Sequence, residues 1–152
     1  MKTLIKNKNT ISKKDNLIIL ANKNTNLSSF DLNQNEKKYI KDQQKNNQEI
    51  IVLNHYLRKI MIVNPKNINN KNLFVENIRE LGNKIYSELK EMNNVSIQNL
   101  ERDKIDSSAF VEGLSLSHYQ FNNHKSKAKK NKDLTINIIN NKNSVNNNEI
   151  EK

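Results

Sequence analysis

The sequence predicts an α/β fold, a three-layer sandwich built around a mixed sheet and similar to macro domains. Three observations predict it. Short apolar runs of strand length recur along the chain, amphipathic helical patterns separate them, and two of the runs follow each other closely enough to form a hairpin. Strands that alternate with amphipathic helices are typical of a sheet covered by helices. The hairpin makes at least one strand pair antiparallel.

The first half of the chain predicts four strands and one helix. Residues 3–6 (TLIK) form a short strand, and residues 16–21 (NLIILA) form an uninterrupted apolar run, as expected of a strand buried on both faces. Residues 33–45 show helical spacing with mostly polar side chains, which predicts a surface helix. Residues 49–56 and 57–64 predict the antiparallel hairpin, and Pro65 ends its second strand.

The clearest helical pattern covers residues 72–94. Gly82 lies beside its apolar stripe, and a glycine inside a helix costs about 1 kcal/mol relative to alanine. Close contact with a neighbouring element would offset that cost, so we expect tight packing at Gly82. The stripe consists of Phe74, Ile78, Leu81, Ile85, Leu89 and Met92.

Residues 94–100 predict a strand, residues 107–121 a helix with Asp106 or Ser107 as its N-cap, and residues 134–140 a last strand. Val111 and Leu116 lie off the main apolar face of this helix, which favours burial on more than one side. The segment 124–133 is a basic loop, and the chain from residue 141 is polar. The main face consists of Phe110, Gly113, Leu114, Ser117 and Phe121.

Composition limits the function classes. The 152 residues suit one domain, and 31 of them are asparagine, which here fills turns and surfaces that other sequences give to glycine or serine. The absence of cysteine excludes disulfides and thiolate metal sites and suits the cytoplasm. No apolar run approaches the roughly 20 residues that cross a bilayer, and the N-terminus lacks the apolar core of a signal peptide, so we expect no membrane association.

No constellation of catalytic, cofactor-binding or metal-ligating residues stands out. The histidines, His55, His118 and His124, show no helical ligand spacing. We expect His55 to be a satisfied residue of the hairpin turn, and the other two to be polar groups at a helix end. Ser115 and Ser117 lie close to His118 in sequence, but neighbouring helical residues point apart. Because the two glycines both fall in predicted helices, no glycine-rich phosphate loop is available.

The net charge of +10 allows two interpretations. The lysines spread over the whole chain, which favours a solvated basic surface. The run Lys125, Lys127, Lys129, Lys130 and Lys132 could instead contact phosphates of nucleic acid. No aromatic side chain is interleaved with this run, so sequence-specific recognition is not expected.

Residues 109–127, AFVEGLSLSHYQFNNHKSK, resemble the A-x-x-E-G-x-x-L-x-x-Y-x-F-x-x-x-K stretch near the end of the N-terminal domain of leucyl (cytosol) aminopeptidases. Residues 78–100, and the segments QNEKKYIKDQQKNN and HYLRKIMIVN, are also similar to that domain, so the resemblance covers most of residues 1–140. The matching positions are Ala109, Glu112, Gly113, Leu116, Tyr119, Phe121 and Lys125.

The resemblance implies a macro-like N-terminal domain at residues 1–140, and a polar linker at 141–152 towards a catalytic domain that this chain lacks. The family removes N-terminal residues from peptides with two divalent metals, Zn or Mn, held by a run such as Asn-Thr-Asp-Ala-Glu-Gly-Arg in the catalytic domain. No such run occurs here. We therefore expect an inactive, cytoplasmic chain whose partners are the catalytic domain, further copies in a homohexamer and, weakly and non-specifically, DNA. The alternative is a free-standing basic nucleic-acid-binding module.

Overall fold

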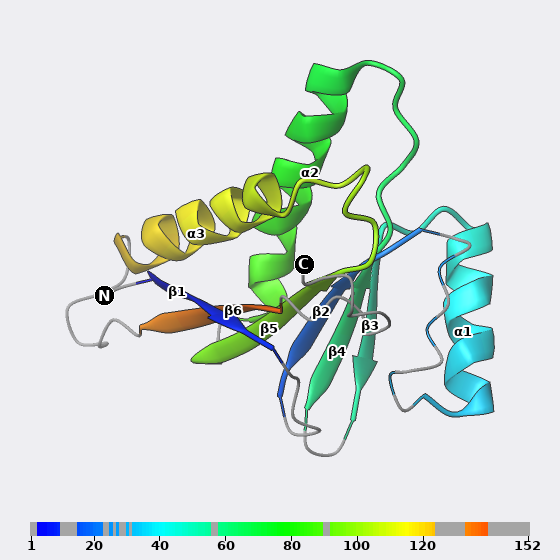
Figure 1. Cartoon of the computed structure of the whole chain (residues 1–152). Coiled ribbons are helices and arrows are strands. Elements are labelled where there is room, and N and C mark those ends of the chain that lie inside the picture. Colours follow the sequence, from blue (N-terminus) through cyan, green and yellow to red (C-terminus); the bar gives the residue numbers. More distant parts are fainter. Residues whose placement is uncertain are drawn as a thin grey trace.

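The computed structural model has one six-stranded mixed sheet between two helical layers (Figure 1). It describes residues 3–9, 15–22, 25, 27, 30, 32–55, 58–89, 92–123 and 133–139. The predicted three-layer α/β class with a mixed sheet and the predicted element order are confirmed. The elements are β1 (Thr3–Lys8), β2 (Leu17–Leu20), α1 (Gln34–Lys45), β3 (Ile50–Asn54), β4 (Lys59–Val63), α2 (Lys71–Ile85), the 3₁₀ helix η2 (Tyr86–Glu88), β5 (Asn94–Asn99), α3 (Ser107–Asn123) and β6 (Leu134–Ile139).

The strands lie in the order β1-β6-β5-β2-β4-β3. Every neighbouring pair is parallel except β3 and β4, which form the predicted antiparallel hairpin with Ile51 opposite Ile62. From β2 the chain passes through α1 to β3 and β4 on one side, and from β5 it passes through α3 to β6 on the other. The strand order therefore reverses between β2 and β5, which makes their carboxyl ends a topological switch point.

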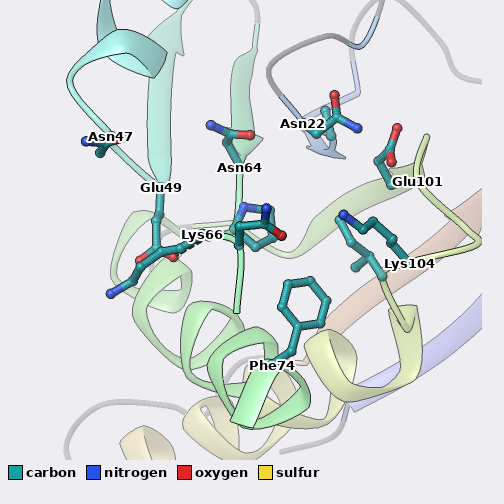
Figure 2. A pocket seen from close by; sticks show the side chains of 12 residues that line it. Asn22, Asn47, Glu49, Asn64, Lys66, Phe74, Glu101 and Lys104 are labelled. Atoms are coloured by element: carbon teal, nitrogen blue, oxygen red, sulfur yellow. Dashed lines mark hydrogen bonds between the residues drawn. The ribbon is translucent and has the colours of Figure 1, made fainter. Parts of the chain in front are cut away.

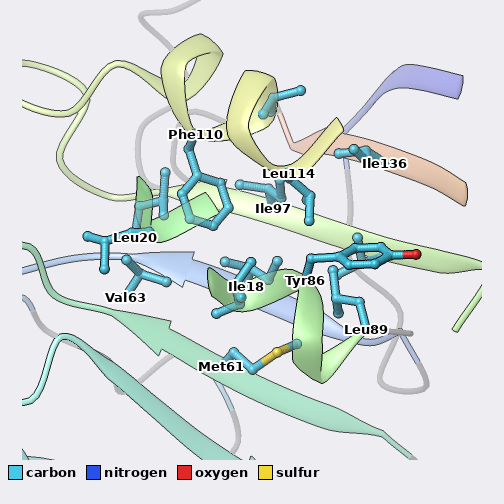
Figure 3. Close-up of a cluster of buried hydrophobic side chains, with 14 of the residues drawn as sticks. Ile18, Leu20, Met61, Val63, Tyr86, Leu89, Ile97, Phe110, Leu114 and Ile136 are labelled. Carbon is cyan, nitrogen blue, oxygen red and sulfur yellow. The ribbon is translucent and has the colours of Figure 1, made fainter. Parts of the chain in front are cut away.

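Two apolar cores lie on opposite faces of the sheet. The larger core joins the sheet to α2 and α3 and includes Ile18, Leu20 and Phe110 (Figure 3). The smaller core includes Leu17, Ile19 and Ile40 of α1. All four residues of β2 have no exposed surface, which confirms the predicted burial on both faces. None of the helices in the described ranges has the length and apolar character of a bilayer-crossing segment.

The helices α2 and α3 cross with their backbones in contact. A Cβ added at Gly82 would overlap the carbonyl oxygen of Phe110, and one at Gly113 would overlap the carbonyl oxygen of Arg79. Each glycine thus faces the backbone of the other helix. This confirms the tight packing expected at Gly82, and it explains how the helix tolerates a glycine in its interior.

Replacing either glycine by alanine should destabilise the fold. Overpacking of this kind costs about 1–3 kcal/mol, which exceeds the gain of about 1 kcal/mol in helix propensity. We expect Gly82→Ala and Gly113→Ala to lower the midpoint of urea unfolding followed by circular dichroism. The exposed Glu80→Ala change on α2 is the control and should shift the free energy by less than about 0.5 kcal/mol. An equal midpoint for all three variants would contradict the close crossing.

Asparagine and aspartate side chains cap the helices. Asn33 forms a capping box with Glu36 at the start of α1, and Asn70 accepts the N–H of Leu73 at the start of α2. Asp106 accepts the N–H of Ser108 at 2.9 Å, so it is the N-cap of α3, as predicted. Asn47, just after α1, has a φ of 61°, a left-handed conformation that glycine usually supplies.

The cap at Asp106 should make stability depend on pH. Hydrogen bonds from the hydroxyl and backbone N–H of Ser108 hold the pKa of Asp106 below its ordinary value of 3.8. Because the pKa of Asp106 is lower in the folded than in the unfolded state, its charged form stabilises the fold at any pH above the unfolded pKa. This stabilisation is lost as the pH falls through the folded pKa. We expect Asp106→Ala to cost about 1 kcal/mol at neutral pH and clearly less once the pH falls well below 3.8, measured by urea unfolding. The exposed Asp103→Ala change is the control; an equal cost for Asp106→Ala at both pH values would contradict the role of the charged cap.

Two helix predictions need correction. The α-helix predicted at residues 72–94 ends at Ile85 and continues as the 3₁₀ turn η2, in which Leu89 N–H bonds to Tyr86. Leu89 is nevertheless buried, because the tighter turn still directs it to the core. In α3, Val111 is buried as expected, but Leu116 is 51% exposed, since no described element covers the outer side of that helix.

Candidate functional site

The histidines and serines weighed from the sequence form no joint site within the part of the chain that the structure describes. His55 bonds to Glu36 Oε2 through Nε2 at 2.6 Å, which confirms it as a satisfied turn residue. His118 is buried inside α3, not at a helix end, and its Nδ1 lies 2.8 Å from Thr3 Oγ1 of β1. Ser117 donates to Asn83 of α2, so it does not pair with His118. His124 and the lysines from 125 to 132 lie outside the described residues.

A pocket of about 520 Å³ opens at the carboxyl edge of the parallel strands (Figure 2). Ligands of open α/β sheets bind at this edge, near the switch point, and the volume falls within the usual range for small-molecule sites. Its lining comes from the segments that follow β2, β4 and β5, from the turn before β3 and from the first turn of α2. The lining residues are Ala21, Asn22, Asn47, Glu49, Asn64, Pro65, Lys66, Asn67, Phe74, Glu101, Lys104 and Ile105.

One side of the pocket carries Glu49 and Lys66 (Figure 2). The Oε2 atom of Glu49 accepts the backbone N–H of Lys66 at 2.9 Å and the side-chain amide of Asn77 at 3.0 Å. These bonds fix the carboxylate against the segment that follows β4. The Lys66 ammonium is exposed and forms no ion pair with any described residue.

The other side carries Glu101 and Lys104, on the loop between β5 and α3 (Figure 2). Asn99 shapes this loop, because its side chain donates to the carbonyl of Ile105 at 2.8 Å and accepts the N–H of Glu101 at 2.8 Å. Glu101 Oε2 also accepts the hydroxyl of Thr25 at 3.3 Å. The Lys104 ammonium, like that of Lys66, meets no ion-pair partner in the described ranges.

Asn64 and Phe74 lie between these two sides (Figure 2). Asn64 is only 6% exposed, and its backbone N–H donates to the carbonyl of Glu49 at 2.7 Å. Phe74 and Pro65 supply an apolar surface beside it.

The described residues do not fit the two-metal centre of an aminopeptidase. Within the described ranges, no three His, Asp or Glu side chains gather closely enough to hold one ion. The carboxylates of Glu49 and Glu101 stand on opposite sides of the pocket, and each already accepts a hydrogen bond from the protein.

Sequence reasoning missed the pocket residues. Three of them could have been found, because Asn22, Asn64 and Glu101 each follow closely on a strand of the parallel set. Polar residues at the carboxyl ends of parallel strands are candidates for binding. The abundance of asparagine hid this signal, since 31 of the 152 residues are asparagine and no single one stands out.

Comparison with known proteins supports the fold. No protein-family model matches the sequence, and no curated protein matches it. Among solved structures, a tomato leucine aminopeptidase variant is similar, with a TM-score of 0.56 and 15% identity over 91% of this chain and 32% of that chain. A Caenorhabditis elegans leucine aminopeptidase matches with a TM-score of 0.41 and 14% identity, over 91% of this chain and 31% of its own.

The chain thus spans about a third of the length of the leucine aminopeptidases that it resembles. At this identity, the likeness to the tomato enzyme concerns the fold alone, and the lower score of the nematode enzyme carries no weight. The tomato enzyme is, by its name, a member of the family that residues 109–127 resemble.

Proposed function

We propose that this chain is a non-catalytic domain related to the N-terminal domain of leucine aminopeptidases, and that it supports assembly of an enzyme that removes N-terminal residues from peptides. The observation that carries the proposal is the match in fold to the tomato enzyme, over 91% of this chain but only 32% of that one. The catalytic metals would be held by another domain. The same proposal includes a cytoplasmic location and a hexameric assembly.

The residues of the resembling segment support a structural role. Gly113 allows α3 to contact α2, and Ala109 is buried beside it. Glu112 accepts a hydrogen bond from Arg79 Nε at 3.0 Å, which is the main cause of a raised pKa at Arg79. These residues therefore pack and orient the two helices.

Two further residues of the segment favour contact with a partner. Leu116 and Tyr119 are 51% and 53% exposed, and their spacing of three places them side by side on the outer surface of α3. Exposed apolar neighbours of this kind often mark protein interfaces. We assign this surface to contact with the catalytic domain.

Assay and assembly experiments test the proposal together. The chain alone should not hydrolyse leucine p-nitroanilide with Mn²⁺ or Zn²⁺. It should co-purify with the separately expressed catalytic region of a leucine aminopeptidase from the same genome. Leu116→Ser combined with Tyr119→Ser should weaken that association about tenfold or more, because hot-spot residues each contribute more than 1 kcal/mol. Tyr39→Ser, on the opposite helical layer, is the control. Turnover by the chain alone, or no association at all, would overturn the proposal.

Weak binding to nucleic acid is the second candidate, favoured by the net charge of +10. We expect non-specific association with duplex DNA at low salt that weakens steeply as salt rises, because phosphate contacts release counterions. Fluorescence anisotropy with labelled DNA from about 20 to 200 mM NaCl measures it. Absence of binding at the lowest salt would eliminate this candidate.

A further inference from the structure

We propose that the free edge of the sheet at β1 binds an extended, acidic segment of another protein, which adds to the sheet as a further strand. This inference goes beyond the assembly role and does not depend on it. It rests on three features of β1: its unpaired backbone edge, the exposure of its side chains on both faces of the sheet, and the charges of Lys6 and Lys8.

The two edges of the sheet differ in how well they are covered. β1 and β3 are the outermost strands, so each has a row of backbone N–H and C=O groups that no strand in the described part of the chain pairs with (Figure 1). In β3, Ile51 and Leu53 are buried in the core beneath α1. In β1, every residue from Leu4 to Lys8 is exposed. An unpaired strand edge is a template for another strand, and β1 is the accessible edge.

The edge at β1 is held in place before any partner binds. β1 pairs with β6 along its whole length, from Thr3 opposite Leu134 to Lys8 opposite Ile139. At the start of the strand, Thr3 Oγ1 lies 2.8 Å from Nδ1 of His118, which is buried in α3. A strand that is already ordered loses little conformational freedom on association, so more of the interaction energy remains as affinity.

The side chains of β1 offer a different chemistry on each face of the sheet. Ile5 is aligned with the core residue Ile136, so it lies on the face of α2 and α3, and it is 57% exposed. Because side chains alternate along a strand, Leu4, Lys6 and Lys8 lie on the opposite face. Neither lysine forms an ion pair with a described residue. A partner strand with apolar side chains beside Ile5 and carboxylates beside the lysines would match both faces.

The lysines decide which kind of partner fits the edge. Lysine side chains protect sheet edges from pairing with copies of themselves, and the net charge of +10 makes two copies of this chain repel each other. An acidic chain is attracted instead. Duplex DNA is attracted as well, but its phosphates offer only acceptors to the strand edge and no apolar side chain to Ile5. The combination therefore favours an acidic protein segment.

Titration of the full chain with a designed strand tests the inference. The probe is a fluorescein-labelled peptide of alternating residues, Glu-Val-Glu-Val-Glu-Val, with both ends blocked. Fluorescence anisotropy should show saturable binding of one peptide per chain. Hydrogen exchange at the backbone amides of residues 3–8 should become slower in the complex, because the added strand covers the edge.

Two altered probes separate the backbone pairing from the charge. Methylation of the backbone nitrogens leaves the charge unchanged but removes the N–H donors, and lysine in place of glutamate reverses the charge. Each altered probe should bind about tenfold more weakly or worse. Equal affinity of the methylated probe, unchanged exchange at residues 3–8, or no binding of the first probe would each overturn the inference. Protection of residues 3–8 by duplex DNA, or by dimerisation of the chain alone, would assign the edge to another occupant and also overturn it.

Variants locate the site on β1. Lys6→Glu and Lys8→Glu should each weaken binding of the glutamate probe several-fold and strengthen binding of the lysine probe, a reversal that a folding defect would not produce. Lys41→Glu, at an exposed position of α1, makes the same change of net charge away from the edge and is the matched control. Unchanged affinity in both β1 variants, or an equal loss in Lys41→Glu, would place binding elsewhere and overturn the assignment.

Discussion

The residues of β2 are shielded from water on both faces of the sheet, and their backbone is hydrogen-bonded along both edges. Ile18 and Leu20 belong to the core beneath α2 and α3, and Leu17 and Ile19 to the core beneath α1. Burial of each such side chain contributes roughly 1.5–3 kcal/mol, and a whole domain is stable by only about 5–15 kcal/mol. The four side chains of β2 therefore belong to the contacts that join both helical layers to one sheet. The packing of each layer also depends on the register of β2 with its neighbours β4 and β5.

The same strand determines where a ligand can bind. Because the chain leaves β2 and β5 in opposite directions, the segments that follow these two strands diverge at their carboxyl ends. The pocket occupies this space, with Asn22 after β2 and Glu101 after β5. Asn99 stabilises the second loop through bonds to Ile105 and Glu101. The charged side chains of the pocket are therefore carried by segments that adjoin the ends of the strands, so the sheet fixes their positions.

Much of the fold could be predicted because each element has a local signal. The continuous apolar run of β2, the hairpin before Pro65 and the helical stripe that begins at Phe74 all have the period or length of the structure that they form. The end of α2 could not be predicted, since a 3₁₀ turn keeps Leu89 on the same apolar face. The buried place of His118 and the pocket depend on contacts between distant segments, such as Thr3 with His118, and no local pattern encodes them.

Asparagine performs tasks in this chain that most proteins divide among serine, aspartate and glycine. Asn33 and Asn70 cap helices, and Asn47 adopts the left-handed conformation. Asn99 stabilises the loop between β5 and α3 through a hydrogen bond to Ile105. At the crossing of α2 and α3, where one backbone touches another, no side chain of any kind has room. Asparagine and lysine can thus occupy the turns and outer surfaces of this architecture, but neither fits at Gly82 or Gly113. Any residue with a side chain at either position would force the two helices apart.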